Sequence, residues 1–205
     1  SLACPICDGD YILAADGGLR HLEKLNLVPH GIIGDFDSLG YAPKGENIIK
    51  HPKIKDDTDT MLCVKKALNL GYKYFEIYGC IGGRLDHTIA NIQTASFVAE
   101  NKGIAVFFDI DNKAALTVIK NDSISFTSDC SGNISVFSVC DKSVGINETG
   151  LLYEVSDGVI TADFPLGVSN EFIGKNASIS VENGKMCIIW DIKTGDFKFG
   201  GNYEK

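Results

Sequence analysis

The sequence predicts an α/β fold in two domains, in which a mainly parallel sheet covered by helices is followed by a C-terminal antiparallel β-sandwich. Up to residue 112, apolar strand-like runs alternate with helical patterns, and such alternation favours parallel strands joined by helices. Beyond that residue, nearly every segment has the pattern of a strand. We therefore expect an α/β domain over residues 1–112 and a β-sandwich domain over residues 113–205.

The first predicted domain contains short apolar segments that have the composition of strands. Helical patterns over residues 19–25, 58–70 and 86–102 fill the gaps between them. The second and third patterns each stop just before a glycine, which is a common helix end because glycine adopts the left-handed conformation without strain. The predicted strands are Tyr11–Ala15, Gly31–Ile33, Tyr74–Tyr78 and Ile104–Phe108.

The second predicted domain contains strand-like segments separated by turn signals. Asp157-Gly158 and Asn183-Gly184 suit two-residue turns with positive φ, so we expect the strands on either side of each pair to form an antiparallel hairpin. The predicted strands are Leu116–Ile119, Ser123–Phe126, Asn133–Cys140, Leu151–Val155, Val159–Phe164, Ala177–Val181 and Met186–Ile192.

Composition and charge narrow the class of protein. The chain has 205 residues, 44% of them hydrophobic and 22% charged, which is typical of a globular chain that buries a core. A net charge of −8 argues against nucleic acid or an anionic membrane as a partner, because both require a cationic surface. The sequence lacks an apolar run of about 18 residues and a signal-peptide pattern, so we expect a cytoplasmic protein.

The cysteines favour reduced thiols over a disulfide framework, because there are seven of them and they are scattered along the chain. Cys4 and Cys7 form one C-x-x-C pair. A redox or zinc role for this pair requires a preceding thioredoxin-like strand or a second pair of ligands, and the sequence shows neither.

Acidic side chains recur at four places in the first 90 residues, each beside a predicted strand or helix. In open α/β sheets the carboxyl ends of parallel strands meet at one edge, where ligands bind. Carboxylates that converge there repel one another by roughly 4 kcal/mol per close pair, so they require a cation between them. A hard divalent ion such as Mg²⁺ prefers carboxylate and phosphate oxygens, which indicates chemistry on a polyphosphate. The acidic residues are Asp16, Asp35, Asp37, Asp56, Asp57, Asp59 and Asp86.

Two of the predicted helices carry Asp59 and Asp86 in their first turns, where backbone N–H groups and the helix dipole can receive phosphate oxygens. Arg84 follows two glycines and carries a planar fork suited to phosphate. The sequence contains neither a P-loop nor a Rossmann glycine motif, so a nucleotide has to be held in another way. Structural roles stay open for these acids, because Asp and Thr also cap helices and organise turns.

In this order, residues 15–18, 34–38, 55–60 and 83–87 resemble the thiamine pyrophosphokinase family. Residues 149–153, 166–170 and 189–191 are similar to that family's C-terminal domain, so the resemblance spans nearly the whole chain. It implies an N-terminal α/β domain, a C-terminal β-sandwich and a homodimer. It also implies Mg²⁺-dependent transfer of diphosphate from ATP to thiamine, with release of AMP.

The resemblance also implies roles for individual residues. Asp59 and Asp86 are the candidates for accepting the proton of the thiamine hydroxyl group, and with Asp35 and Asp37 they form the implied catalytic set. The thiamine pocket is expected to face the partner subunit's α/β domain. The implied ligands are Asp35, Asp37 and Asp59 for Mg²⁺; Asp16, Ser38, Lys55, Thr58, Arg84, Asp86 and His87 for ATP and its phosphates; and Ser169, Asn170 and Trp190 for thiamine.

Three alternatives stay open at the level of the sequence. A haloacid-dehalogenase-type phosphatase also places an Asp-x-Asp pair after an apolar strand, with Asp35 as nucleophile and Asp37 as acid and base. A protein that only senses thiamine or a nucleotide accounts for a pocket but leaves the acids without a purpose. Trp190 shares one strand face with Met186 and Ile188, so it fits a core position as well as a thiamine pocket.

Overall fold

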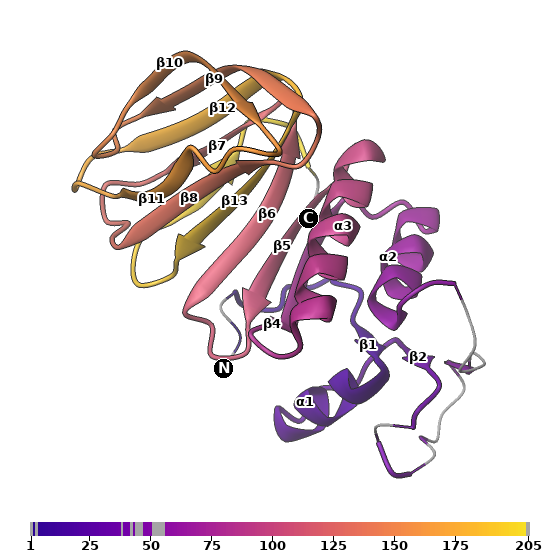
Figure 1. The fold of residues 1–205 in the computed structure, drawn as a ribbon. Helices are drawn as coiled ribbons and strands as arrows, with labels where there is room; N and C mark the ends of the chain where they lie inside the picture. The colour runs from indigo at the N-terminus through magenta and orange to yellow at the C-terminus, as the bar shows by residue number, and fades with distance from the viewer. Residues whose placement is uncertain are drawn as a thin grey trace. The chain divides into compact units, whose positions relative to one another are not determined.

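The computed structural model describes residues 2, 4–37, 39–41, 43, 47–50 and 56–203. The chain divides into two compact units, which we call the N-terminal unit (residues 1–72) and the C-terminal unit (residues 73–204). Figure 1 shows the elements of both. Within the described ranges, no helix has the length and apolar character needed to span a bilayer.

The N-terminal unit contains a parallel sheet with the strand order β1-β2-β3. Helix α2 packs against β1 and β2 and buries Val64 and Ala67. It begins at a capping residue, since the Thr58 hydroxyl accepts a hydrogen bond from the Met61 N–H at 3.2 Å. The elements are β1 (Leu13–Ala15), the 3₁₀ helix η1 (Asp16–Gly18), α1 (Leu19–Lys24), β2 (Gly31–Gly34), β3 (Ile48–Lys50) and α2 (Asp59–Asn69).

The C-terminal unit contains two sheets and one long helix (Figure 1). One sheet has the order β11-β8-β13-β6-β5-β4 and the other β10-β9-β12-β7-β14. Helix α3 (Leu85–Glu100) packs on β4, β5 and β6. The strands are β4 (Tyr74–Ile81), β5 (Ile104–Asp109), β6 (Ala114–Lys120), β7 (Ser123–Phe126), β8 (Asn133–Ser138), β9 (Lys142–Thr149), β10 (Val155–Thr161), β11 (Gly167–Glu171), β12 (Ala177–Asn183), β13 (Lys185–Asp191) and β14 (Phe197–Phe199).

The predicted parallel strands divide between the two units. Strands β4 and β5 are parallel, but β5 also pairs in antiparallel register with β6, where Phe107 lies opposite Leu116. The strands of the predicted α/β domain (β4 and β5) and those of the predicted β-sandwich domain (from β6 on) therefore pair within one continuous six-stranded sheet. The predicted domain boundary at residue 112 falls between β5 and β6 of this sheet, and it stays a proposal.

Both predicted hairpins are wrong. Asn183-Gly184 links β12 to β13, but these strands belong to different sheets, so the turn crosses the sandwich. Asp157 does adopt a positive φ of 51°, yet it lies inside β10 at a bulge opposite β9. A turn dipeptide sets the local backbone angle, whereas tertiary packing decides which strand becomes the partner.

Several strand boundaries also differ from the prediction. The predicted strand 151–155 is mostly a loop with an isolated bridge between Leu151 and Phe172, while β9 precedes it. Strands β3, β9, β11 and β14 were not predicted. Two of them, β3 and β14, have three residues each, which is too short for a period-two pattern to stand out.

Trp190 on β13 occupies the core between the two sheets of the C-terminal unit, where it is 4% exposed. Its ring meets those of Phe126 on β7 and Phe197 on β14 edge to face, with centroids 5.5 Å and 5.2 Å away. Such pairs add stability beyond the burial of apolar area. This position agrees with the core alternative for Trp190.

We expect Trp190→Ala to lower the free energy of unfolding by about 3–5 kcal/mol, because it opens a cavity within this aromatic cluster. Urea titration followed by circular dichroism measures the change. Trp190→Phe, which keeps an aromatic ring, is the matched control and should cost less. A loss below about 1 kcal/mol for the alanine variant would contradict the core assignment.

Candidate functional site

Two loops meet at the carboxyl ends of β1 and β2, where Ala15 lies opposite Ile33 in parallel register. The Asp16 carboxylate reaches across and accepts a hydrogen bond from the Phe36 N–H at 3.1 Å. Gly34 allows this approach, since a Cβ there would lie 3.0 Å from the Asp16 Cα atom. The predicted meeting of the Asp16 and Asp35 segments is therefore present in the fold.

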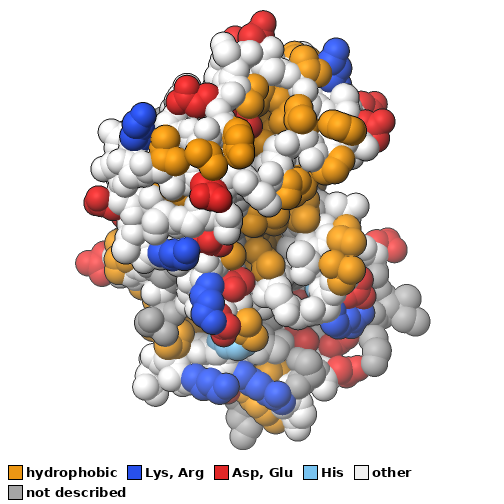
Figure 2. All heavy atoms as spheres, turned by 60° about the vertical axis from the view of Figure 1, so that its left-hand side comes forward, with side chains coloured by type: hydrophobic (Ala, Val, Ile, Leu, Met, Phe, Trp, Pro, Cys, Tyr) orange, Lys and Arg blue, Asp and Glu red, His pale blue; other side chains and the backbone are white. Residues whose placement is uncertain are grey.

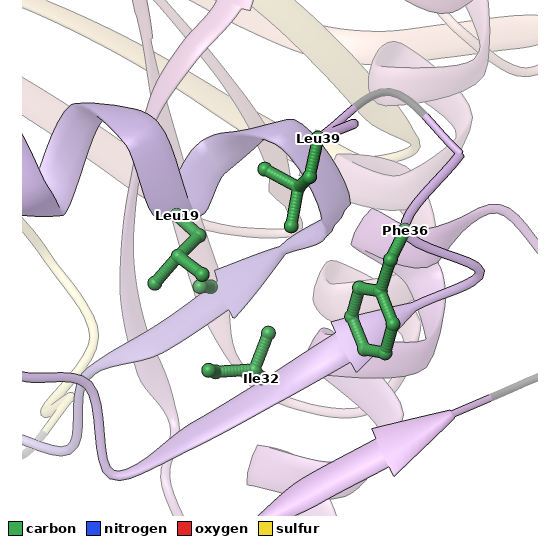
Figure 3. Packing of buried hydrophobic residues seen from close by; sticks show 5 residues of the cluster. Leu19, Ile32, Phe36 and Leu39 are labelled. Atoms are coloured by element: carbon green, nitrogen blue, oxygen red, sulfur yellow. The ribbon is translucent and has the colours of Figure 1, made fainter. Parts of the chain in front are cut away.

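Phe36 holds the second loop in an uncommon conformation. Its φ is 66°, a region that bulky residues rarely adopt, and Asp16 also has a positive φ of 43°. The Phe36 ring is buried in a cluster with Leu19, Ile32 and Leu39, as Figure 3 shows. Burial of the ring and the hydrogen bond that the Phe36 N–H donates to Asp16 both favour this backbone geometry. Strain of this kind is concentrated at functional sites.

Asp35 and Asp37 flank Phe36. Asp35 Oδ1 accepts the Asp37 N–H at 3.1 Å, so this carboxylate organises the turn that carries its neighbour. Asp37 is exposed and Asp35 is half-buried. Ser38, a predicted ATP ligand, lies outside the described residues.

The start of α2 brings a third acidic segment to the N-terminal unit. Thr58 is the N-cap, and Asp59 lies in the first turn, where the helix dipole favours negative charge. Lys65, further along the same helix, contacts both carboxylate oxygens of Asp57 at 2.8 Å. This ion pair ties Asp57, the residue before the N-cap, to the second turn of α2. Lys55, the other predicted ligand in this segment, lies outside the described residues.

The described acids do not form a ready-made metal cage. Among the residues that the structure describes, no group of three or more His, Cys, Asp or Glu side chains lies close enough to hold a metal ion. The acidic side chains of the N-terminal unit come instead from separate segments: Asp16 starts η1, Asp35 and Asp37 follow β2, and Asp59 starts α2. Such a set suits an ion that also binds substrate oxygens.

In the C-terminal unit, the predicted phosphate loop leads from β4 into α3. Arg84 is the N-cap of α3, and its guanidinium donates to both carboxylate oxygens of Asp86, at 3.1 Å and 2.5 Å. This bond lowers the pKa of Asp86 from its ordinary value, aided by the His87 N–H that donates to Asp86 Oδ1. All three residues are exposed. Both carboxylate oxygens of Asp86 thus already accept hydrogen bonds from Arg84.

The predicted thiamine residues lie on two strands of the six-stranded sheet. Ser169 on β11 is exposed, has a φ of 62°, and donates its N–H to Ser135 Oγ at 3.0 Å. Asn170, its neighbour, is buried and bonded within the fold. Trp190 on β13 is in the core described above. The structure thus separates one exposed candidate from two buried ones.

The analysis of the sequence gave no individual role to two residues of this region, although Tyr153 lies in the segment 149–153 that carries the resemblance. Glu148 on β9 is a buried acid, 2% exposed, and Tyr153 lies in the loop that joins β9 to β10. Both contact Asn170. A signal for Glu148 was available, because it stands two residues after buried Ile146 and so shares its strand face.

The comparisons with known families match both halves of the chain. The model "Thiamin pyrophosphokinase, catalytic domain" matches residues 6–108, and "Thiamin pyrophosphokinase, vitamin B1 binding domain" matches residues 121–186. The chain is 27% identical over 187 residues to the thiamine pyrophosphokinase of Bacillus subtilis (strain 168), covering 86% of this chain and 85% of that protein.

Solved structures show the same fold. The crystal structure of thiamine pyrophosphokinase from Bacillus subtilis aligns with a TM-score of 0.80 and 22% identity, over 92% of this chain and 91% of that one. Thiamin pyrophosphokinase from Candida albicans aligns with a TM-score of 0.72 and 17% identity, over 90% and 82%. These likenesses confirm the predicted fold class of an α/β domain followed by a β-sandwich.

The predicted resemblance is confirmed, and the phosphatase alternative finds no support in these comparisons. The catalytic-domain model alone covers half of the chain, and the second model follows it in the expected order. The chain belongs to the thiamin pyrophosphokinase family.

Proposed function

We propose that this chain catalyses the transfer of diphosphate from ATP to the hydroxyethyl group of thiamine, which gives thiamine diphosphate and AMP. The observation that carries this proposal is the succession of a thiamin pyrophosphokinase catalytic segment and a vitamin B1 binding segment in one chain. The strained acidic loops of the N-terminal unit are consistent with it.

Catalysis of this reaction depends mainly on positioning the two substrates and on stabilising the charge that develops in the transition state. The thiamine hydroxyl is a weak nucleophile that must be aligned with the β-phosphorus while charge develops toward the leaving AMP. The start of α2 supplies backbone N–H groups, and the ATP contacts that we propose are Asp16, Ser38, Lys55, Thr58, Arg84 and His87. Arg84 uses part of its fork on Asp86, and its remaining N–H groups are available to phosphate oxygens.

Asp35, Asp37 and Asp59 would hold Mg²⁺ together with the phosphates. Mg²⁺ sites in phosphoryl-transfer enzymes use one or two carboxylates plus substrate oxygens, so the separate acidic loops fit such an ion without a complete protein cage. The bound ion would neutralise charge on the transferred group. Because Arg84 donates to both carboxylate oxygens of Asp86, we favour Asp59 as the acceptor of the hydroxyl proton.

We propose Ser169 as a contact of thiamine, while the burial of Trp190 favours a core role for that residue. Exposed apolar side chains gather on the C-terminal unit (Figure 2), and this supports the predicted homodimer. A reaction that consumes ATP also fits the predicted cytoplasmic location. Between residues 152 and 173, the large exposed apolar residues of this unit are Leu152, Tyr153, Val159, Phe164, Leu166, Val168 and Ile173.

If these apolar residues form the dimer interface, Leu166→Asp should shift the protein from dimer to monomer, because the buried charge is costly. Light scattering coupled to gel filtration measures the mass. Asp8→Asn, an exposed change in the N-terminal unit, is the control. A wild-type mass equal to one chain would contradict the homodimer.

Incubation with ATP, Mg²⁺ and thiamine tests the function directly. We expect AMP and thiamine diphosphate in equal amounts, resolved by ion-exchange chromatography, and loss of both products when the metal is chelated with EDTA. Release of inorganic phosphate would instead support the phosphatase, and thiamine binding without turnover would support a sensor.

In the same assay, Asp37→Asn tests the proposed metal role of this carboxylate. We expect kcat to fall by about 100-fold or more with an unchanged melting temperature, since Asp37 is exposed and contributes little to packing. Asp8→Asn serves as the matched control and should keep wild-type turnover. Wild-type turnover of Asp37→Asn would refute its role.

Two substitutions separate the roles of Asp16. Asp16→Ala removes the acceptor of the Phe36 N–H, and we expect a loss of about 1–3 kcal/mol of stability. Asp16→Asn keeps an acceptor oxygen but loses the charge, so it should retain the melting temperature and lower kcat/KM for ATP. Full activity of the asparagine variant would leave Asp16 with the turn role alone.

A further inference from the structure

The side-chain amide of Asn170 is fully used inside the C-terminal unit. Its Nδ2 atom donates to Glu148 Oε2 at 3.1 Å and to the Tyr153 carbonyl oxygen at 2.7 Å. Its Oδ1 atom accepts the Tyr153 N–H at 3.0 Å and the Glu171 N–H at 2.9 Å. An asparagine amide offers two donor hydrogens and two acceptor lone pairs. The four bonds therefore leave this amide without capacity for a ligand.

These bonds fix the loop between β9 and β10. Asn170 binds both the N–H and the carbonyl of Tyr153, so it substitutes for a neighbouring strand at that residue. Within the same loop, the Gly150 N–H donates to Glu154 Oε1 at 2.8 Å. The Tyr153 side chain itself stays exposed, at 67%. The network thus holds a surface aromatic residue in a defined place.

Glu148 sets the orientation of the Asn170 amide. It is 2% exposed, and burial raises the pKa of its carboxyl group, while the bond from Asn170 acts in the opposite direction. A buried acid of this kind is costly unless a donor satisfies it. An amide rotated by half a turn would place Oδ1 against Glu148 Oε2 and would lose both bonds to Tyr153. Glu148 and the Tyr153 backbone therefore favour the same one of the two amide orientations.

Ser169 directly precedes Asn170, whose side chain this network holds in place. It has a left-handed φ of 62°, and its N–H donates to Ser135 Oγ at 3.0 Å. A non-glycine residue keeps such a conformation only where its surroundings enforce it. The exposed Ser169 hydroxyl is thereby presented at a fixed point of the surface.

We propose that Glu148 is a positioning residue of the thiamine pocket, which acts through Asn170 on Ser169 and on the Tyr153 loop. This inference rests on the proposed function. In this proposal Asn170 shapes the pocket and does not contact thiamine. Ser169 is the residue that would hydrogen-bond thiamine directly.

Steady-state kinetics of two Glu148 variants test the inference. Glu148→Met keeps the bulk of the side chain but removes the acceptor, and we expect the KM for thiamine to rise by roughly tenfold, the effect of one lost hydrogen bond. The KM for ATP should stay within about twofold, because none of the proposed ATP contacts takes part in the hydrogen bonds of the network. Glu148→Gln can still present an oxygen to Asn170 Nδ2 and should rescue the KM for thiamine.

Thr117→Val is the matched control for stability. Thr117 is 0% exposed in the same unit, and its hydroxyl donates to the Ala105 carbonyl at 2.9 Å between β6 and β5. This variant also loses a buried hydrogen bond, so we expect a comparable drop in melting temperature with an unchanged KM for thiamine. A rise of the same size in Thr117→Val would overturn the positioning role.

An unchanged KM for thiamine in Glu148→Met would also overturn it. If that variant does not fold, the pair Asn170→Asp and Glu148→Gln decides the question. Asn170→Asp places two acids together and should raise the KM for thiamine, and Glu148→Gln in the same chain should lower it again by supplying a donor. No such recovery would refute the coupling. A wild-type protein that makes no thiamine diphosphate would refute the proposed function instead.

Discussion

The hydrogen bond from the Phe36 N–H to the Asp16 carboxylate is the constraint on which the N-terminal unit's candidate site depends. It joins the ends of two parallel strands and supports a left-handed phenylalanine that local sterics disfavour. The buried Phe36 ring supplies the other half of this support. Asp35 and Asp37 lie on either side of that residue, so their placement depends on the packing of Phe36 as well as on the hydrogen bond from the Asp37 N–H to Asp35 Oδ1.

In the C-terminal unit, buried polar side chains hold a loop in place. A β-sandwich core accepts Glu148 and Asn170 only because each satisfies the other, and the same bonds immobilise the loop around Tyr153. Aromatic packing around Trp190 fills the space between the sheets. In both units, buried or hydrogen-bonded groups hold in place side chains that we propose to bind substrate. Rigid support of this kind is what positions side chains accurately enough for phosphoryl transfer.

The helices and strands show which features of the fold the local sequence pattern predicts correctly. Strand β7 over residues 123–126 has the predicted bounds, and α2 ends within a residue of its predicted end, because alternation and capping are local properties. The hairpins at Asp157-Gly158 and Asn183-Gly184 failed because a turn does not determine which strands pair. β11 was missed because Val168 and Ser169 are exposed and a register shift interrupts its alternation.

The sequence by itself determined the family, the fold class and the acidic loops beside the strands, because these follow from ordered short motifs and from periodicity. Only the tertiary structure decided how individual side chains are used: Asp16 supports a turn, Arg84 engages Asp86, Trp190 packs in a core, and Asn170 has its amide filled. The physical reason is that hydrogen-bond capacity is limited and its partners come from distant segments. Glu148 and Asn170 are 22 residues apart, and no local pattern records that they meet.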